Sequence, residues 1–352
     1  MKKQLLFLLT FCLSAIGYSQ VFTDNFITYT VYSVANNTVR VHSYDAAGGA
    51  NVIIPATIDY NSVTYTVVAI NQMAFMNKGL TSVSLPSTLT NIGLFAFATN
   101  QLSNIVIPNT VSSIGTAAFQ DNQLTSANIP TSLTIIEDQV FRNNLLTSAV
   151  IPNGVTSIGQ ASFFGNQLTS VSIPSSVTNI SSYAFNTNQL TSVTIPENVT
   201  FIGNFAFNAN PLANVSSLAT TPPTITTSGD IFDTFAIDRS TIYLHIPPGT
   251  TGAYVTDAGA LWTGFASTTE DALSTSNFEL ENEIKIITTE NGLNIVSNNG
   301  LQLENYTIYN LSGQEVVKGI ETVIETTSFS RGIYIVNLNF DKGSVVKKVL
   351  IK

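Results

Sequence analysis

The stretch LTSVSIPSSVTNISSYAFNTNQ at residues 168–189 is followed at once by LTSVTIPENVTFIGNFAFNANP at residues 190–211. Both copies follow the pattern L-T-S-V-x-I-P-x-x-V-T-x-I-x-x-x-A-F, in which x is any residue. The leading Leu recurs every 22 residues from Leu80 to Leu212. A fixed internal period of roughly 20–50 residues is the signature of a protein built from stacked repeats, so this stretch decides the fold.

Four further positions of the repeat keep the same step of 22 residues. They are Pro86, Pro108, Pro130, Pro152, Pro174 and Pro196; Ile92, Ile114, Ile136, Ile158, Ile180 and Ile202; Phe75, Phe97, Phe119, Phe141, Phe163, Phe185 and Phe207; and Asn100, Asn122, Asn144, Asn166, Asn188 and Asn210. A single repeat cannot bury its own apolar face, so the copies must stack and share one core.

The apolar positions of each repeat predict a short strand and a closed coil. Leu168, Val171 and Ile173 lie in a short segment that is rich in β-branched residues and is ended by Pro174, which favours a strand over a helix. A second apolar set, with Ile180 and Phe185, fills the other side of the coil. Gly at positions such as Gly115 is expected in a tight turn. The predicted fold is mostly β, a solenoid of 22-residue repeats between two caps, followed by a small β-sandwich.

The Asn positions form a structural ladder in this interpretation. An Asn side chain carries both donors and acceptors, so it can turn inward and bond the backbone of the loops. The ladder consists of Asn100, Asn122, Asn144, Asn166, Asn188 and Asn210. A ligand-binding role for the same residues is the alternative, although buried polar groups usually have structural partners.

The motif L-x-x-[LVIA]-x-[LI] at this period is similar to a leucine-rich repeat, and the stretch I-P-x-x-V-T-x-I-G-x-x-A-F resembles the BspA-like repeats of bacterial surface proteins. The resemblance covers about residues 50–220. Before it, Ile53-Ile54-Pro55 matches the end of a repeat strand. After it, residues 241–265 look like the closing cap of that family. The open end of a solenoid needs such a cap, because it would otherwise expose core and strand edges.

The last part of the chain has a different character. Residues 273–352 hold 7 Lys/Arg and 9 Asp/Glu, against 4 and 13 in residues 20–272. Short alternating strands such as Tyr306–Leu311 and Gly332–Leu338 predict a β-sandwich. The segments Y-N-L-S-G-Q-E-V, R-G-I-Y-I-V and K-K-V-L-I-K are similar to the type A C-terminal sorting domain of the type IX secretion system of Bacteroidetes. The P-N-P motif with which that domain usually opens is missing from this sequence. This resemblance implies the secretion machinery as a partner and removal of the tail at the surface.

The first residues have the layout of a secretory signal peptide: Lys2 and Lys3, a short apolar run, and small residues up to Ser19. The run is too short to span a membrane, and the chain's single Cys, Cys12, lies inside it. We therefore expect a secreted or outer-surface protein with no transmembrane segment after signal removal. The expected domains are a signal peptide (1–19), an N-terminal cap with a first divergent repeat (20–79), the repeats (80–219), a C-terminal cap (220–272) and the sorting domain (273–352).

Only 10% of the 352 residues are charged, against about 25% in ordinary globular domains. The 13 Lys/Arg and 22 Asp/Glu give a net charge of −9, which excludes nucleic acid as a partner. Arg142 is the only basic residue between Leu80 and Ala219. Stacking explains this scarcity, because a charge repeated every 22 residues would form a column of like charges on neighbouring strands.

The residues that carry chemistry are few and scattered. His42 and His245 lie in the two flanking segments, and neither has an acidic residue in a zinc-binding pattern. Asp230, Asp233 and Asp238 form the only local carboxylate cluster before the tail. It could bind Ca²⁺ but matches no EF-hand loop. The sequence predicts no catalytic residue, no cofactor and no metal site; an enzyme that uses Asp230 or Asp233 is the third hypothesis.

The outward positions of the predicted strands form a small, neutral, hydroxyl-rich face. Its candidate binding residues are Ser82, Ser84, Asn104, Ser126, Asn128, Ser148, Ser170, Ser172, Ser192 and Thr194. The Tyr, Trp and Arg residues that anchor tight protein partners are missing from it. The leading hypothesis is adhesion to an extracellular glycan, matrix or protein partner. The alternative is a structural or ice-interacting solenoid, based on Thr ladders such as Thr125, Thr147 and Thr169.

Overall fold

The computed structural model describes residues 20–226, 229–271, 284–289, 292–297, 302–310, 315–340 and 343–351. Contacts divide the chain into two compact units, Met1–Leu146 and Thr147–Lys352, and each unit is described by itself. The expected signal peptide at residues 1–19 lies outside the described residues, and so does the segment 272–283, which contains the expected start of the sorting domain.

The N-terminal unit opens with a capping sheet. Its elements are β1 (Val21–Asp24), β2 (Ile27–Ser33), β3 (Thr38–Tyr44), β5 (Thr57–Tyr60) and β6 (Val63–Ile70), with a single 3-10 turn, η1 (Ala46–Gly48). β1, β2 and β3 pair antiparallel, and β3 pairs parallel with β6. Alternate side chains such as Tyr29, Val39 and Val67 are buried, so the sheet covers the end of the apolar core with one of its faces.

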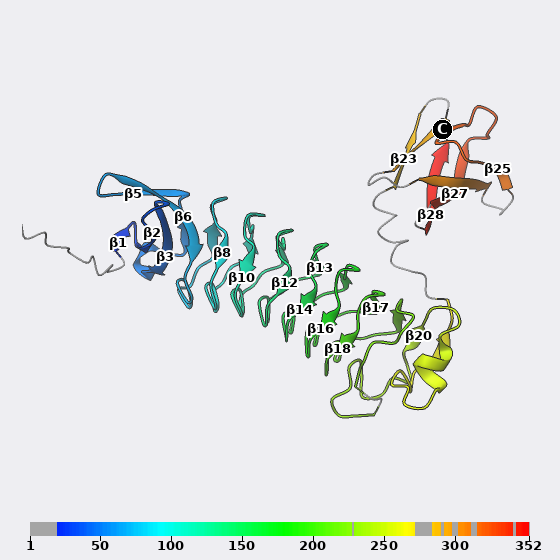
Figure 1. Ribbon diagram of the computed structural model, residues 1–352, viewed down its shortest axis with the longest axis horizontal. Coiled ribbons are helices and arrows are strands. Elements are labelled where there is room, and N and C mark those ends of the chain that lie inside the picture. Colours follow the sequence, from blue (N-terminus) through cyan, green and yellow to red (C-terminus); the bar gives the residue numbers. More distant parts are fainter. Residues whose placement is uncertain are drawn as a thin grey trace, which may run out of the picture. The chain divides into compact units, whose positions relative to one another are not determined.

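The coils of this unit carry two rows of short strands (Figure 1). The first row consists of β4 (Asn51–Ile53), β7 (Ser82–Ser84), β9 (Asn104–Ile105) and β11 (Ser126–Ala127). The second row consists of β8 (Asn91–Ile92), β10 (Ser113–Ile114) and β12 (Ile135–Ile136). Strands β6, β8 and β10 pair in parallel, so the capping sheet continues into the second row. The predicted strands lie in the first row; the second row comes from the half of the repeat for which only a second apolar set was expected.

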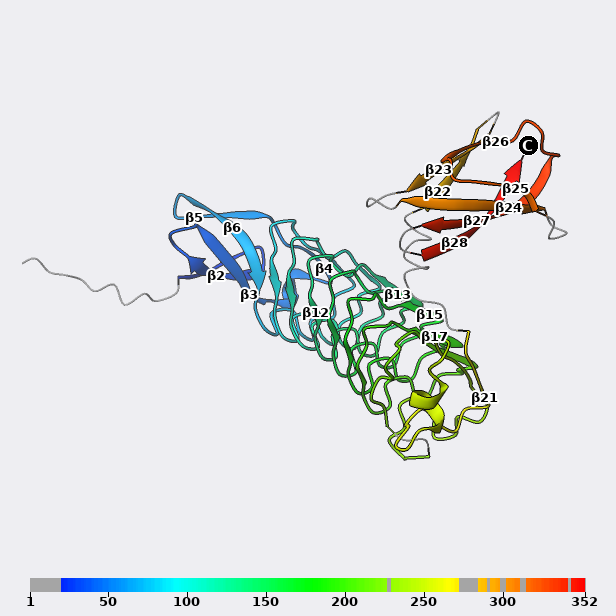
Figure 2. The same cartoon turned by 45° about the vertical axis from the view of Figure 1, so that its right-hand side comes forward.

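The C-terminal unit continues with coils of the same design, and Figure 2 shows the coils of each unit one behind another. Its first row is β13 (Ser148–Val150), β15 (Ser170–Ser172), β17 (Ser192–Ile195) and β19 (Asn214–Ser217), followed by β20 (Tyr243–His245) and β21 (Ser267–Thr269). Its second row is β14 (Ser157–Ile158), β16 (Asn179–Ile180) and β18 (Phe201–Ile202). Strands β17, β19, β20 and β21 form one parallel sheet.

Buried Phe side chains stack from coil to coil inside each unit. In the N-terminal unit the ring centroids of Phe75, Phe97, Phe119 and Phe141 follow one another at 5.0, 5.5 and 5.8 Å. In the C-terminal unit Phe163, Phe185, Phe207 and Phe235 follow at 5.4, 5.3 and 5.9 Å. All eight are 1% exposed or less. Burying a Phe side chain stabilises a fold by roughly 1.5–3 kcal/mol, so this ladder is a main source of stability.

The repeated Gly begins the expected tight turn, since the N–H of Ala118 donates to the carbonyl of Gly115 at 3.2 Å, and it also has a role that was not expected. Gly115 is not among the residues with positive φ, so it does not mark a left-handed turn. A Cβ built on it would lie 2.6 Å from the backbone N of Leu94 in the preceding coil. The residue is therefore Gly because two backbones approach closely there. The left-handed turn comes two residues later, at Ala117 with φ 56°.

A compact cap ends the coils of the C-terminal unit. It contains a short π-helix, η2 (Gly252–Thr256). Trp262 is fully buried and contacts Phe235 at 5.3 Å between ring centroids. The buried hydroxyl of Tyr254 donates to the carbonyl of Ala219 at 2.6 Å. These aromatic side chains close the end of the Phe ladder, which agrees with the expectation that Trp262 belongs to the core of the cap.

The tail forms two sheets packed face to face. One sheet contains β22 (Ile284–Thr288), β23 (Gly292–Ser297) and β26 (Val323–Glu325), and the other contains β24 (Leu303–Asn310), β25 (Glu315–Gly319), β27 (Gly332–Phe340) and β28 (Gly343–Ile351). Residues of both sheets, including Leu293, Ile324, Ile308 and Val336, share one buried cluster. The predicted β-sandwich is confirmed. In the described part of the chain, no helix is long and apolar enough for a membrane span.

Candidate binding face

The outward side chains of the first-row strands form an exposed surface in each unit, which we call the strand face. The core residues alternate with it: Leu168 and Ile173 are buried, whereas Ser170 between them is exposed. Period-2 alternation of this kind places one set of side chains in the core and the other in solvent. The strand face is therefore a direct product of the pattern L-x-S-V-x-I.

The ten residues proposed from the sequence all lie on the strand face. Nine are exposed and Ser172 is half-buried; they are Ser82, Ser84, Asn104, Ser126, Asn128, Ser148, Ser170, Ser172, Ser192 and Thr194. Some of them also bond within the face: Asn128 accepts from the N–H of Ile107 at 2.8 Å and donates to its carbonyl at 2.6 Å. These two bonds hold the Asn128 amide against the backbone of the preceding coil.

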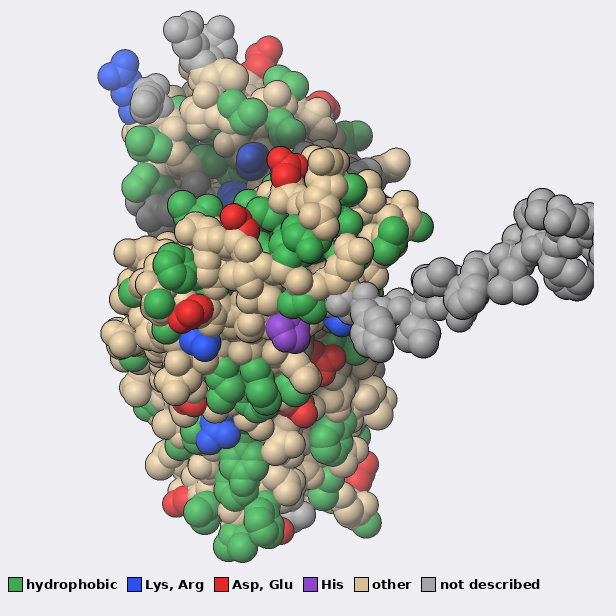
Figure 3. Space-filling view, turned by 90° about the vertical axis from the view of Figure 1, so that its left-hand side faces the viewer, with side chains coloured by type: hydrophobic (Ala, Val, Ile, Leu, Met, Phe, Trp, Pro, Cys, Tyr) green, Lys and Arg blue, Asp and Glu red, His purple; other side chains and the backbone are tan. Residues whose placement is uncertain are grey.

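The strand face is not uniformly polar. Ile53 is 76% exposed, and Val106 and Val150 are 70% exposed. Each follows an outward Ser or Asn by two residues in its strand segment, so apolar side chains interrupt the hydroxyl-rich row. Figure 3 views the molecule from the left-hand side of Figure 1, and charged side chains are few there among uncharged polar and hydrophobic ones.

The six ladder Asn side chains point into the coils and bond loop backbone. Asn100, Asn122, Asn144, Asn166 and Asn188 are buried and Asn210 is half-buried. The Oδ1 of Asn188 accepts from the N–H of Leu168 at 3.0 Å, and its Nδ2 donates to the carbonyls of Phe163 and Phe185 at 2.9 and 3.0 Å. One amide thus joins two consecutive coils, and its hydrogen-bonding groups are used inside the fold.

The Thr ladders also use their hydroxyl hydrogens along the stack. Thr178 and Thr200 each donate to the backbone carbonyl of the Thr 22 residues earlier, at 3.2 Å. Thr125 and Thr169 make the same bond to Ser103 and Thr147, at 3.4 and 3.2 Å. A hydroxyl that donates to protein keeps only acceptor sites for water. The Thr ladders therefore join the edges of consecutive coils by hydrogen bonds to backbone carbonyls.

The three carboxylates proposed for Ca²⁺ serve separate structural roles. Asp233 is fully buried and forms an ion pair with the buried Arg239, with Nε 2.9 Å from Oδ2. Asp230 and Asp238 are exposed and accept from nearby backbone N–H groups of Phe232 and Ser240, both at 2.8 Å. Among the described residues no three His, Cys, Asp or Glu side chains converge on a point where a metal ion could bind. The Ca²⁺ hypothesis therefore loses the clustered geometry that it requires.

The pair of Asp233 and Arg239 holds the C-terminal cap together. Arg239 also donates to the carbonyls of Leu261 and Thr226, at 3.1 and 2.5 Å. Burial lowers the pKa of the guanidinium, and the Asp233 carboxylate works in the opposite direction. A buried pair that is fully hydrogen-bonded in this way is a structural element, because removal of one partner leaves an uncompensated charge.

The two His residues are placed differently. His42 is exposed on β3, and its Nδ1 lies 3.3 Å from the amide nitrogen of Asn71. His245 lies on the strand face of β20, with Nδ1 2.8 Å from Oδ1 of Asp271 and Nε2 3.2 Å from Oδ1 of Asn214. The exposed Tyr243 precedes it by two residues on the same strand.

This aromatic and ionisable end of the strand face was not predicted from the sequence. The signal was present: Y-L-H-I-P at residues 243–247 aligns with S-V-S-I-P at residues 170–174. Tyr243 and His245 therefore occupy the outward positions that Ser170 and Ser172 occupy in a regular coil. The step from Asn214 to its partner Tyr243 is 29 residues instead of 22, which hides the match from a search at fixed period.

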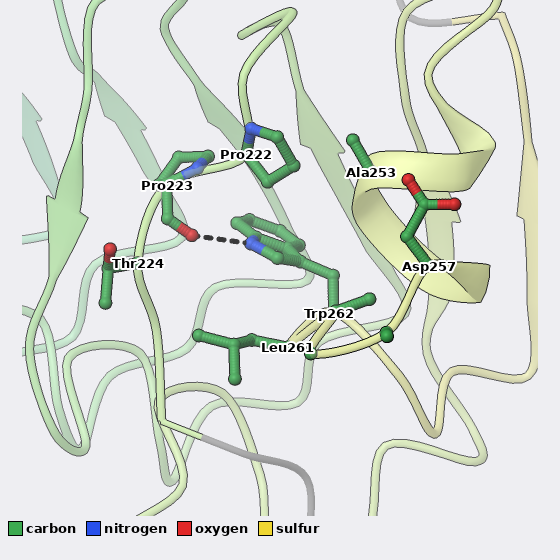
Figure 4. A pocket seen from close by; sticks show the side chains of 10 residues that line it. Pro222, Pro223, Thr224, Ala253, Asp257, Leu261 and Trp262 are labelled. Atoms are coloured by element: carbon green, nitrogen blue, oxygen red, sulfur yellow. Dashed lines mark hydrogen bonds between the residues drawn. The ribbon is translucent and has the colours of Figure 1, made fainter.

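An open cleft of about 290 Å³ lies in the C-terminal cap (Figure 4). Pro222, Ala253, Asp257 and Leu261 line it, and the buried Trp262 backs it with its Nε1 donating to the Pro223 carbonyl at 2.8 Å. Because the Trp262 ring is fully covered, the cleft offers no aromatic surface for stacking. It is a shallow feature between cap loops.

The repeats and the tail of the chain each match a known protein family. The model of the BspA type leucine rich repeat region matches six copies, over residues 68–188 and 134–242. The chain is a BspA-type leucine-rich-repeat protein. The model of the secretion system C-terminal sorting domain matches residues 289–352 of this BspA-type protein. Together the two matches indicate a secreted or outer-surface protein that is handled by type IX secretion machinery. Neither matching model describes a family of enzymes.

One solved structure with a TM-score above 0.5 shows the same repeat fold. The BspA-type protein is 27% identical to a leucine rich cell surface protein from Faecalibacterium prausnitzii, with a TM-score of 0.53, over 71% of this chain and 72% of that one. A leucine-rich repeat protein from Bacteroides ovatus is 18% identical with a TM-score of 0.40, over 70% and 76% of the two chains. One from Eubacterium ventriosum is 18% identical with a TM-score of 0.34, over 74% and 86%. No curated protein sequence matches the chain.

Proposed function

We propose that this BspA-type protein is an adhesion protein that binds an extracellular glycan, matrix or protein partner through its strand face. The observation that carries the proposal is the exposure of small neutral side chains along the first row in both units, from Ser82 to Thr194. Backbone groups of this row are used within the sheets, so the face offers side-chain hydroxyl and amide groups. The similarity to a leucine rich cell surface protein supports the same class of role.

Charge supports contact with neutral or weakly charged surfaces. The outward residues from Ser82 to Thr194 contain no Lys, Arg, Asp or Glu, so long-range steering by charge plays little part in recognition. Surfaces without hot-spot side chains bind each partner weakly. Many copies on one cell would then supply avidity, because linked binding events act at high effective concentration.

The test is binding of the purified protein to intact cells and to arrays of glycans and matrix proteins. We expect binding that falls in the variants Ser126→Arg and Ser192→Arg, which place one large cation on the strand face of each unit. Ser113→Arg is the matched control, because Ser113 is exposed on the second-row strand β10. Absence of binding to every cell, glycan and matrix protein would exclude the proposal.

The ice-interacting alternative has less support than adhesion. The Thr hydroxyl hydrogens that were expected to order water are bonded to backbone carbonyls of the preceding coil. We therefore expect the purified protein to show no thermal hysteresis in a freezing-point measurement. A clear hysteresis gap would restore the alternative.

A further inference from the structure

The end of the strand face in the C-terminal unit differs chemically from the rest. Strands β19, β20 and β21 place six outward side chains in two short lines across the sheet. The registers pair Asn214 with Tyr243 and Tyr243 with Ser267, and they pair Ser216 with His245 and His245 with Thr269. Neighbouring strands lie about 4.8 Å apart. An aromatic ring and an imidazole therefore stand side by side, each between small polar side chains.

Tyr243 is the only Phe, Tyr or Trp among the outward residues of the described first-row strands. It is 52% exposed, and its neighbours across the sheet are only an Asn and a Ser. A Tyr ring combines an apolar face with a hydroxyl that exchanges hydrogen bonds. Such a ring, open to solvent on a rigid sheet, is a surface on which a flat ligand can stack.

His245 is held in a fixed orientation beside this ring. Its Nδ1 lies 2.8 Å from Asp271 Oδ1 and 2.9 Å from Thr269 Oγ1, and Thr269 Oγ1 itself donates to Asp271 at 2.8 Å. These bonds hold the pKa of Asp271 below its usual range, chiefly through His245. Nε2 lies 3.2 Å from Asn214 Oδ1, so the imidazole and the Asn214 amide are held together next to the Tyr243 ring.

The neighbouring chemistry restricts the ligand. No Lys or Arg is present among the outward first-row residues of the described C-terminal unit, and the Asp271 side chain is 59% exposed, which disfavours an anion. Tight protein interfaces use several clustered anchors in a desolvated pocket, whereas this surface has one ring among hydrogen-bonding groups. A pyranose has the matching character: one face of C–H groups and a rim of hydroxyls that both donate and accept.

We propose that Tyr243, His245, Asn214 and Asp271 form a subsite for a neutral sugar residue at the end of the strand face. The sugar stacks on the Tyr243 ring, and its hydroxyls bond to the Asn214 amide, the exposed Asp271 carboxylate and Nε2 of His245. The inference rests on the proposed binding function and assigns it a ligand class and a place. The hydroxyl-rich strands that precede β20 would then contact the continuing chain of a glycan.

The test uses the purified protein and a panel of neutral oligosaccharides of glucose, mannose, galactose and N-acetylglucosamine, with heparin as the anionic comparison. Binding is measured by titration calorimetry. We expect at least one neutral oligosaccharide to bind and heparin not to bind. Tyr243→Ser should weaken the neutral sugar at least tenfold, and His245→Thr several-fold. Both variants restore residues that regular coils carry at these positions, Ser170 and Thr194, so the fold should be preserved, which thermal unfolding checks.

The matched control is Tyr32→Ser, because Tyr32 is 62% exposed on strand β2 of the N-terminal cap and outside the strand face. Its affinity for sugar should equal that of the unaltered protein. The inference is overturned if no neutral oligosaccharide binds, or if Tyr243→Ser binds as tightly as the unaltered protein. If the protein binds cells or matrix proteins equally well with and without Tyr243, the adhesion proposal stands and the sugar subsite fails.

Discussion

The side-chain oxygen of Asn122 accepts a hydrogen bond from the backbone N–H of Leu102 at 3.1 Å. The amide nitrogen of Asn122 donates to the carbonyls of Phe97 and Phe119 at 2.9 and 3.2 Å. One buried side chain thus joins its own coil to the preceding one. A buried polar group without a partner raises the free energy of the fold by roughly 1–3 kcal/mol, so this amide is a structural link between coils.

Replacement of Asn122 should therefore destabilise the N-terminal unit. We expect Asn122→Ala to lower the free energy of unfolding by about 1–3 kcal/mol, because at least one backbone group loses its partner. Asn122→Asp should be at least as damaging above pH 5, since a carboxylate accepts from Leu102 but cannot donate to the Phe carbonyls. Chemical denaturation measures both. Asn104→Ala, on the exposed strand face, is the control; an equal loss there would show that burial of the amide is irrelevant.

The buried pair of Asp233 and Arg239 gives a second prediction. Asp233→Ala leaves the guanidinium charge without its counterion, and we expect a loss of about 3–5 kcal/mol. The double variant Asp233→Ala with Arg239→Met should recover much of this loss, because it removes both charges. Thermal unfolding of the three proteins is the measurement. A double variant no more stable than Asp233→Ala would mean that the hydrogen bonds from Arg239 to backbone carbonyls matter more than the charge pairing.

Glu270 makes the stability of the C-terminal cap depend on acid. Its carboxylate accepts from Thr251 Oγ1 at 2.6 Å and from the N–H groups of Thr251 and Gly249 at 3.0 and 2.9 Å. These bonds lower its pKa from 4.5 to about 2. A carboxyl group with a depressed pKa stabilises the fold above its unfolded pKa and loses this contribution as the pH falls through the folded value.

The corresponding experiment compares the unaltered protein with Glu270→Gln between pH 7 and pH 2. The unaltered protein should be the more stable of the two above about pH 4.5, and the difference should shrink as the pH falls towards 2. The difference in melting temperature at each pH is the readout. Parallel curves across the whole range would show that the Glu270 bonds do not form in solution.

The scarcity of charge on the strand face can be tested with paired substitutions. Ser148 and Ser170 are register partners on the parallel strands β13 and β15. We expect the double variant with Lys at both positions to be less stable than the sum of the single variants by about 0.2–1 kcal/mol, because like charges lie directly opposite each other. Added NaCl should reduce this coupling. The pair Ser148→Lys with Ser170→Glu is the control and should show no penalty.

Much of the fold can be predicted from the sequence because each position of the repeat packs against the same position of the next coil. The recurrence of Leu168, Ile173 and Phe185 at a step of 22 residues predicts the core and the first-row strands without any knowledge of long-range contacts. The second-row strands, such as Asn179–Ile180, are only two residues long and leave no alternating pattern. The turn expected at Gly115 is present, but sequence alone does not show that two backbones also approach closely there.

The sequence was less informative about the cap and the site. The pairing of Asp233 with Arg239 depends on a loop that does not repeat, so no register predicts it, and Asp233 was therefore grouped with Asp230 and Asp238 as a Ca²⁺ candidate. Tyr243 and His245 were missed as outward residues because the step before β20 is longer than the period. Where the period stops, local pattern no longer determines which residues become neighbours, and only the folded chain shows it.

The hydrogen bonds of Thr178 and Thr200 to the carbonyls 22 residues earlier have a consequence for how such chains change over generations. Each coil within a unit presents to its successor the same carbonyls, rings and amides that it receives from its predecessor. Loss or duplication of a whole number of coils therefore joins surfaces that already fit. Loss of 21 residues would instead shift every later position of the repeat out of register with the coil before it. Chain length becomes a variable that recombination between repeats can adjust in fixed steps, lengthening or shortening the surface that a cell presents without the design of a new core.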